Sequence, residues 1–190
     1  DSDRLFSVGD LVDRGEESNQ AIDWIYYHWF HACKGNHDQM AIDFARGTGW
    51  PMSLLDYSYN GGSWNIANSL EERETVALCF EDSPLGIEVE TANGLVGLIH
   101  AECPFNDWNK FKESEQDSSV DNTSMWERSR YYNMDRSLVQ GVKSLVVGHT
   151  PMNEPLVLGN VWYIDTMGWR PNGKFTLLDL STMEPISYTL

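Results

Sequence analysis

Residues 9–15, GDLVDRG, follow directly on a short and largely apolar run at residues 4–8, RLFSV. The run is typical of a buried strand. Gly9 allows the backbone to turn sharply at its end, so that Asp10 points out beyond the strand. Open α/β sheets bind their ligands at the carboxyl ends of their strands. The segment therefore predicts an α/β fold with a carboxylate at the ligand-binding edge of a sheet.

Three further segments place metal-ligand or acid–base residues behind an apolar, strand-like run. They are GNHD at residues 35–38, IHA at residues 99–101 and VGHT at residues 147–150. These segments supply Asn36, His100 and His149. With Asp10 they form a set of oxygen and nitrogen donors that suits Mn²⁺, Fe or Zn²⁺. The set contains no thiolate, which disfavours a structural zinc site.

The remaining pattern alternates helices and strands. We expect helices at residues 18–29, with Ser18 as the cap, at 37–46, and from a capping box at Ser69–Glu72 to about Phe80. Expected strands are 30–34, 86–91, 95–100, 142–147, 161–165 and 174–180. Asn93-Gly94 predicts a type I′ hairpin turn between two of these strands, and Asn172-Gly173 a link between the last two. The polar residues 105–122 suggest a long surface loop, either a plain connection or a lid beside the site.

Composition limits the class of protein. Across 190 residues there are 13 Lys and Arg against 29 Asp and Glu, a net charge of −16. Nucleic acids and anionic membranes need a basic face, so we expect neither as a partner. No apolar run approaches the roughly 18 residues of a membrane-spanning helix. Three widely spaced cysteines make a disulfide framework improbable and favour a cytoplasmic location.

Taken in this order and spacing, the four segments resemble the metallophosphoesterase superfamily. Within it they resemble the phosphoprotein phosphatase family of the bacteriophage lambda and enterobacterial serine/threonine type. NGGSW at residues 60–64, WER at 126–128 and YIDT at 163–166 extend the likeness to roughly residues 5–180. The resemblance implies an α/β metallophosphatase-type β-sandwich of two sheets flanked by helices.

The resemblance also implies two divalent metal ions, most readily Mn²⁺, with Fe or Zn²⁺ as alternatives. Asp10 corresponds to the carboxylate that bridges the two metals. Asn36, His100 and His149 correspond to the other ligands of the second metal. Carboxylate, amide and imidazole donors are a reasonable set for such ions.

The resemblance also assigns the residues that act on the substrate. His37 corresponds to the general acid that protonates the leaving oxygen, with Asp38 orienting it. Arg14 and Arg128 correspond to the pair that binds the phosphoryl oxygens, with Asn36 also on the substrate side. The implied reaction is hydrolysis of phosphoserine or phosphothreonine in a phosphoprotein or phosphopeptide, with phosphotyrosine as a further substrate. In the implied mechanism, a hydroxide held between the two metals would attack phosphorus in line. We expect Asp13 to be a partner of Arg14, and Trp64 to be either a core residue or a wall of the cleft.

The family carries an earlier GDxHG motif, whose Asp and His bind the first metal. Only nine residues precede Asp10, and the motif is not among them. We therefore expect residues 1–190 to form a single catalytic domain that is N-terminally incomplete and lacks the first strand–helix unit. Two alternatives stay open: a dinucleoside polyphosphate hydrolase, such as one acting on diadenosine tetraphosphate, and a catalytically inactive phosphate-binding homologue.

Overall fold

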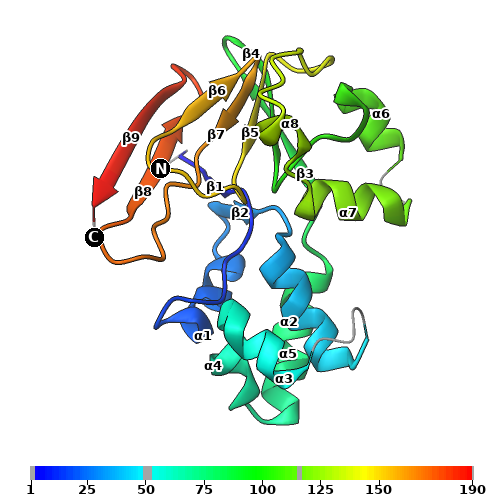
Figure 1. The fold of residues 1–190 in the computed structure, drawn as a ribbon, viewed down its shortest axis with the longest axis vertical. Helices are drawn as coiled ribbons and strands as arrows, with labels where there is room; N and C mark the ends of the chain where they lie inside the picture. The colour runs from blue at the N-terminus through cyan, green and yellow to red at the C-terminus, as the bar shows by residue number, and fades with distance from the viewer. Residues whose placement is uncertain (1–2, 49–52, 115–116, 190) are drawn as a thin grey trace. The chain divides into compact units, whose positions relative to one another are not determined.

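The computed structural model describes residues 3–48, 53–114 and 117–189. These residues fall in two compact units, Asp1–Pro84 and Leu85–Leu190 (Figure 1). Each unit contains both strands and helices, so the predicted α/β class is confirmed. That the two units act as one catalytic domain stays a prediction. Within the described ranges, no helix is both long enough and apolar enough to cross a bilayer.

The first unit contains a pair of parallel strands. Strand β1 (Leu5–Ser7) pairs with β2 (Phe30–Ala32), with Leu5 opposite Phe30. Both strands were predicted from their apolar runs. Since the strands are parallel, their carboxyl ends lie at the same edge. The GDLVDRG and GNHD segments follow these two ends and are therefore brought together.

Helices make up most of the rest of this unit. They are α1 (Ser18–Ala21), α2 (Asn36–Arg46), α3 (Leu54–Tyr57), α4 (Ser63–Ile66) and α5 (Leu70–Glu81), with single turns η1 (Ile22–Tyr26) and η2 (Ser58–Gly62). Helices α2 and α5 share an apolar core made of Val12, Ala41, Ile42, Val76 and Phe80. Helix α5 begins with the predicted capping box. The Ser69 hydroxyl accepts from the Glu72 backbone N–H, and the Glu72 carboxylate accepts from that of Ser69.

The helix predicted over residues 18–29 is wrong in length and in its cap. The α-helical part ends at Ala21, and a single tighter turn follows to Tyr26. Glu17 occupies the cap position, because the buried Ser18 hydroxyl donates to the Gly15 carbonyl of the preceding turn. Beyond this turn the aromatic rings pack on one another, with Tyr27 stacked on Trp29 at 5.3 Å. These contacts between rings outweigh the helical periodicity.

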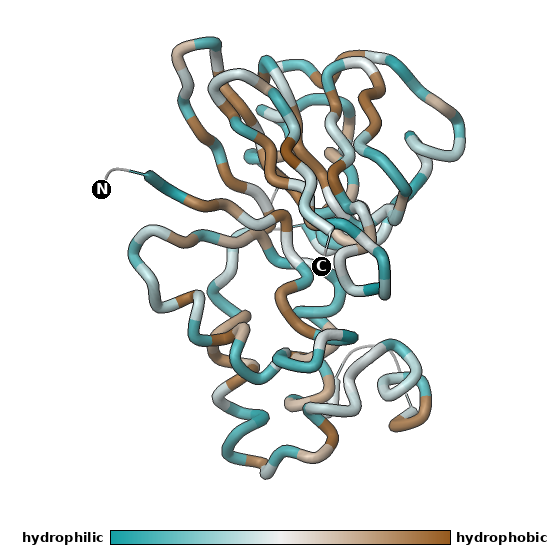
Figure 2. The backbone as a smooth tube through the Cα atoms, turned by 90° about the vertical axis from the view of Figure 1, so that its left-hand side faces the viewer, coloured by the Kyte–Doolittle hydropathy of each residue, from teal (hydrophilic) through white to brown (hydrophobic). Residues whose placement is uncertain are grey.

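The second unit is built on a five-stranded mixed sheet. Its strands are β3 (Gly86–Thr91), β4 (Gly94–Ile99), β5 (Ser144–Val147), β6 (Leu156–Leu158) and β7 (Val161–Tyr163), in the order β3-β4-β5-β7-β6 (Figure 1). Hydrophobic residues recur along these strands (Figure 2). The neighbours β4 and β5 run parallel, with Leu98 opposite Val146. The segments that carry His100 and His149 therefore leave the sheet at the same edge.

Three details of the strands differ from the predictions. The hairpin β3–β4 forms, but its positive φ lies at Gly94 (122°), whereas a type I′ turn needs it at both central residues. Strands β8 (Lys174–Asp179) and β9 (Glu184–Thr189) pair with each other rather than with β7, so the described strands form three sheets and not two. Strand β9 was missed because Pro185 argues against a strand except at an edge, which is where β9 lies.

The predicted loop at 105–122 is also wrong. Its described residues form η3 (Pro104–Asn106), α6 (Trp108–Glu113) and the first part of α7 (Ser118–Trp126); helix α8 (Ser129–Tyr132) follows. Trp108, Phe111 and Val120 are almost fully buried in the core of this unit. The high proportion of polar residues hid this pattern, because three apolar side chains are enough to anchor two short helices.

The three cysteines form no disulfide and differ in their burial. Cys33 and Cys103 are buried, and burial raises the pKa of the Cys103 thiol to about 12, whereas Cys79 is partly exposed. We expect a thiol reagent at pH 8 to label Cys79 in the native protein and the other two only after unfolding. Peptide mapping by mass spectrometry checks this. Rapid labelling of Cys103 in the native state would contradict the burial.

Candidate active site

Asp38 joins the two loops that follow β1 and β2. Its carboxylate accepts hydrogen bonds from the backbone N–H groups of Asp10 (2.9 Å), Leu11 (2.9 Å) and Gly35 (2.8 Å). It occupies the third position of α2, where a carboxylate also interacts favourably with the helix N-terminus. Asp38 is 1% exposed. Its three hydrogen bonds therefore hold the GDLVDRG and GNHD segments together.

The contact between these loops leaves no room for a side chain at Gly35. A Cβ there would lie 2.2 Å from Asp10 Oδ1 and 2.4 Å from the Asp10 nitrogen. Asp10 Oδ1 in turn accepts from the His37 N–H at 2.9 Å. The Asp10 carboxylate is thus held in place by the start of α2, on which Asn36 is also buried.

The backbone of GDLVDRG is strained. Asp10, Asp13 and Arg14 have φ angles of 57°, 75° and 64°. Such conformations cost non-glycine residues about 1–3 kcal/mol each and persist only where the surroundings impose them. The bonds to Asp38 provide that constraint at Asp10. Strain of this kind is concentrated at functional sites, which agrees with the predicted roles of Asp10 and Arg14.

The ring of His37 pairs with Asp13. His37 Nδ1 lies 2.7 Å from Asp13 Oδ2, and both residues are buried. The prediction that Asp38 orients His37 is therefore corrected, since the Asp38 oxygens bind backbone N–H groups. Asp13, which was expected to be a partner of Arg14, thus holds the ring of His37. A carboxylate accepts, so Nδ1–H donates, and Nε2 is the nitrogen that can exchange a proton with a substrate.

The second unit brings His100 and His149 together. His100 follows β4, His149 follows β5, and the Gly148 N–H donates to the His100 carbonyl at 2.9 Å. His100 Nε2 and His149 Nδ1 lie 3.1 Å apart, and both side chains are buried. His149 has a φ of 61°. Two imidazoles that converge in this way are a common arrangement for binding a metal.

Backbone carbonyls hold the side chains of both His149 and Arg128. His149 Nε2 lies 3.1 Å from the Trp126 carbonyl, and Arg128 Nη2 donates to the His149 carbonyl at 3.1 Å. Because a carbonyl only accepts, His149 Nε2 carries the proton and Nδ1 presents its lone pair toward His100. The structure thus places the predicted Arg128 beside the predicted ligand His149.

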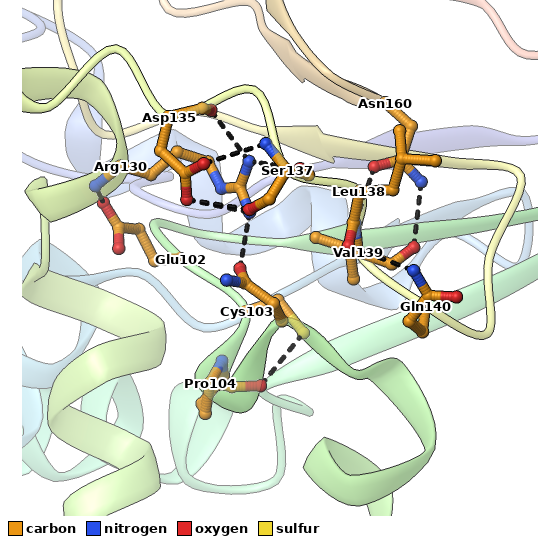
Figure 3. A network of polar contacts seen from close by, with 11 residues as sticks. Glu102, Cys103, Pro104, Arg130, Asp135, Ser137, Leu138, Val139, Gln140 and Asn160 are labelled. Atoms are coloured by element: carbon orange, nitrogen blue, oxygen red, sulfur yellow. Dashed lines mark hydrogen bonds and ion pairs between the residues drawn. The ribbon is translucent and has the colours of Figure 1, made fainter.

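A polar network around the buried side chain of Arg130 supports the segment that carries Arg128 (Figure 3). The Arg130 N–H donates to Glu102 Oε1 at 2.6 Å, and its guanidinium donates to the carbonyls of Asp135 (3.0 Å) and Ser137 (2.8 Å). Burial raises the pKa of the Glu102 carboxyl above its usual range. The network connects the loop after β4 with the start of α8.

A family model described as calcineurin-like phosphoesterase matches residues 2–178. The chain belongs to this family. Serine/threonine-protein phosphatase 1 of Salmonella typhimurium is 31% identical over 180 residues, which cover 92% of this chain and 77% of that relative. Calcineurin-like phosphoesterases hydrolyse phosphoesters with a dinuclear divalent metal centre, so the resemblance drawn from the motifs is confirmed at this level.

Solved structures agree on the fold. A protein described as a candidate diadenosine tetraphosphatase superimposes with a TM-score of 0.60 at 15% identity, covering 99% of this chain and 81% of the other. A cold-active protein-tyrosine phosphatase of a psychrophilic Shewanella gives a TM-score of 0.57 at 18% identity, covering 98% and 66%. At these identities the likeness concerns the fold alone.

The residues of each unit suit the metal centre of a calcineurin-like phosphoesterase. The His100 and His149 rings offer two converging nitrogens, and the tautomer of His149 leaves a lone pair on the nitrogen that faces its partner. Asp10 and Asn36 offer the oxygen donors from the first unit. Imidazole and carboxylate donors match Mn²⁺, Fe and Zn²⁺, which is the choice that the sequence predicted.

Proposed function

We propose that this calcineurin-like phosphoesterase is a metal-dependent phosphoprotein phosphatase acting on phosphoserine and phosphothreonine, and also on phosphotyrosine. The observation that carries the proposal is the buried contact of 2.7 Å between His37 and Asp13. It sets His37 to give a proton from Nε2, which is what the departure of a serine or threonine oxygen requires. The Salmonella relative is named a serine/threonine-protein phosphatase, which supports a phosphoprotein as the substrate.

Asp10, Asn36, His100 and His149 would hold the metal ions, with Mn²⁺ as the proposed metal and Fe or Zn²⁺ as alternatives. When bound, such ions neutralise phosphate charge and lower the pKa of a water ligand. The Asp10 carboxylate is suited to its part because Gly35 and the His37 N–H fix its position. Cys33, Cys79 and Cys103 form no disulfide, which favours a reducing compartment, so we also propose a cytoplasmic location.

Arg14 and Arg128 would bind the phosphoryl oxygens, together with Asn36. A guanidinium stays charged at any working pH and can hold two oxygens of a phosphate at once. The backbone conformation of Arg14 sets the direction in which its side chain leaves the loop, and the bond to the His149 carbonyl holds the guanidinium of Arg128. His37 would then protonate the leaving oxygen while Asp13 holds its ring.

Hydrolysis of p-nitrophenyl phosphate by this chain, with Mn²⁺ or with EDTA, tests the proposal. We expect turnover in Mn²⁺ that EDTA abolishes. Folded protein that binds inorganic phosphate but turns over nothing in Mn²⁺, Fe or Zn²⁺ would instead identify a catalytically inactive phosphate-binding homologue.

The fold neighbour described as a candidate diadenosine tetraphosphatase favours a second function, hydrolysis of dinucleoside polyphosphates. The two substrates differ in their leaving groups: an alkoxide from a phosphoserine, and a nucleotide from diadenosine tetraphosphate. Initial rates on a phosphoserine peptide and on diadenosine tetraphosphate separate them. A much higher kcat/KM for the phosphopeptide is the expected result.

A further inference from the structure

The NGGSW segment lies directly against the loop that carries Asp13 and Arg14. Gly61 has a φ of 109°, and a Cβ there would lie 2.6 Å from the Arg14 nitrogen and 3.1 Å from the Asp13 Cβ. This close approach admits only glycine. It brings the next residues, at the start of α4, into contact with the side chain of Asp13.

Trp64 uses this position to bind the Asp13 carboxylate. Its indole Nε1–H donates to Asp13 Oδ1 at 2.7 Å, while Asp13 Oδ2 accepts from His37 Nδ1 at 2.7 Å. Each carboxylate oxygen thus has its own donor. A carboxylate held at both oxygens cannot rotate about its last bond, and Asp13 is only 8% exposed, so water competes little for either oxygen.

We propose that Trp64 is a positioning residue for the proton-donating histidine. By fixing the plane of the Asp13 carboxylate, the indole N–H fixes the tautomer and ring orientation of His37, and so the direction in which Nε2 faces. This role rests on the proposed phosphatase function and adds a residue to it. The predicted role of Trp64 as a wall or core residue would not require its N–H.

Trp64→Phe tests the role, because it removes the N–H and keeps an aromatic ring. We expect KM to stay the same and kcat for a phosphoserine peptide to fall about 10-fold, in line with the loss of a group that orients a catalytic residue. The fall should be much smaller for p-nitrophenyl phosphate, because its leaving group is a weak base and needs little protonation.

Trp108→Phe is the matched control. Trp108 Nε1 donates to Glu88 Oε2 at 2.6 Å, so this variant also breaks a bond between an indole and a carboxylate, but in the core of the second unit. We expect equal effects on the two substrates there. If Trp64→Phe also lowers kcat equally on both substrates, its role is only structural and the proposal is overturned.

A readout by NMR spectroscopy is independent of turnover. The neutral ring of His37 is the form left after Nε2 has given up its proton. Its ¹⁵N shifts should place the remaining proton on Nδ1 alone in the unmodified protein and show a mixture of the two tautomers in Trp64→Phe. Unchanged shifts would overturn the proposal even if activity fell. If the unmodified chain shows no turnover, the proposed function fails while the tautomer measurement still decides the role of Trp64.

A second measurement covers the case in which Trp64→Phe does not fold. The Trp64 indole proton of the unmodified protein should exchange slowly with solvent, and its resonance should move in His37→Asn. Rapid exchange, or a resonance that His37→Asn leaves in place, would overturn the link from Trp64 through Asp13 to His37.

Discussion

His37→Asn should lower kcat by about 10²–10⁴-fold, the usual loss when a general acid is removed. Asn keeps a side chain that can bond to the Asp13 carboxylate, 2.7 Å from the native ring, so the loop should keep its shape. It has no proton to give at neutral pH. We therefore expect KM for a phosphoserine peptide to change little while turnover nearly stops.

The measurement is steady-state kinetics in Mn²⁺, with Mn²⁺ affinity followed by calorimetry. His28→Asn is the matched control, because His28 is exposed and lies outside both motif loops. Normal metal binding with greatly reduced turnover is the expected pair of results. Unchanged turnover in His37→Asn would remove His37 from the mechanism and leave the Asp13 pair as a structural contact.

Arg130→Met should destabilise the protein strongly. The guanidinium is 6% exposed and donates to two backbone carbonyls as well as to Asn106 and Ser137 side chains (Figure 3). Methionine fills much of the same space and offers no donor, so these acceptors lose their partners. A hydrogen bond made by a charged group contributes about 1.5–3 kcal/mol. We expect the free energy of unfolding to fall by about 3 kcal/mol.

Thermal and denaturant unfolding measure this loss. For a chain of this size about 3 kcal/mol corresponds to a decrease in Tm of roughly 6–12 °C. Arg136→Met is the control: Arg136 is exposed, so its loss should stay within about 0.5 kcal/mol. Equal stability of the two variants would show that the Arg130 network contributes nothing to the fold.

Local features of the chain were predictable because neighbouring residues determine them. The capping box at Ser69 satisfies its backbone groups within four residues, and Gly9 and Gly35 follow the ends of their strands within three residues. The strands β1, β2, β4 and β5 and the polar residues that follow them were therefore recognised, and with them the donor types of the site and the family.

The partners of the site residues depended on distant parts of the chain. Asp38 stands next to His37 in the sequence, yet its carboxylate turns back to the N–H groups of Asp10 and Leu11. Asp13, 24 positions away, takes the His37 ring, and Trp64 binds Asp13 from 51 positions away. No local sequence pattern predicts which carboxylate a histidine ring will bind.

The amino-acid sequence alone thus determined the family, the chemistry of the donor set and the strand ends that present it. The tertiary structure alone decided that residues 108–113 are helical, that the helix after Ser18 stops early, and that Asp13 orients His37. The reason is physical. Turns and caps are decided by contacts within a few residues, whereas burial of Trp108 and Phe111, and the choice among competing carboxylates, depend on which surfaces meet when the chain packs.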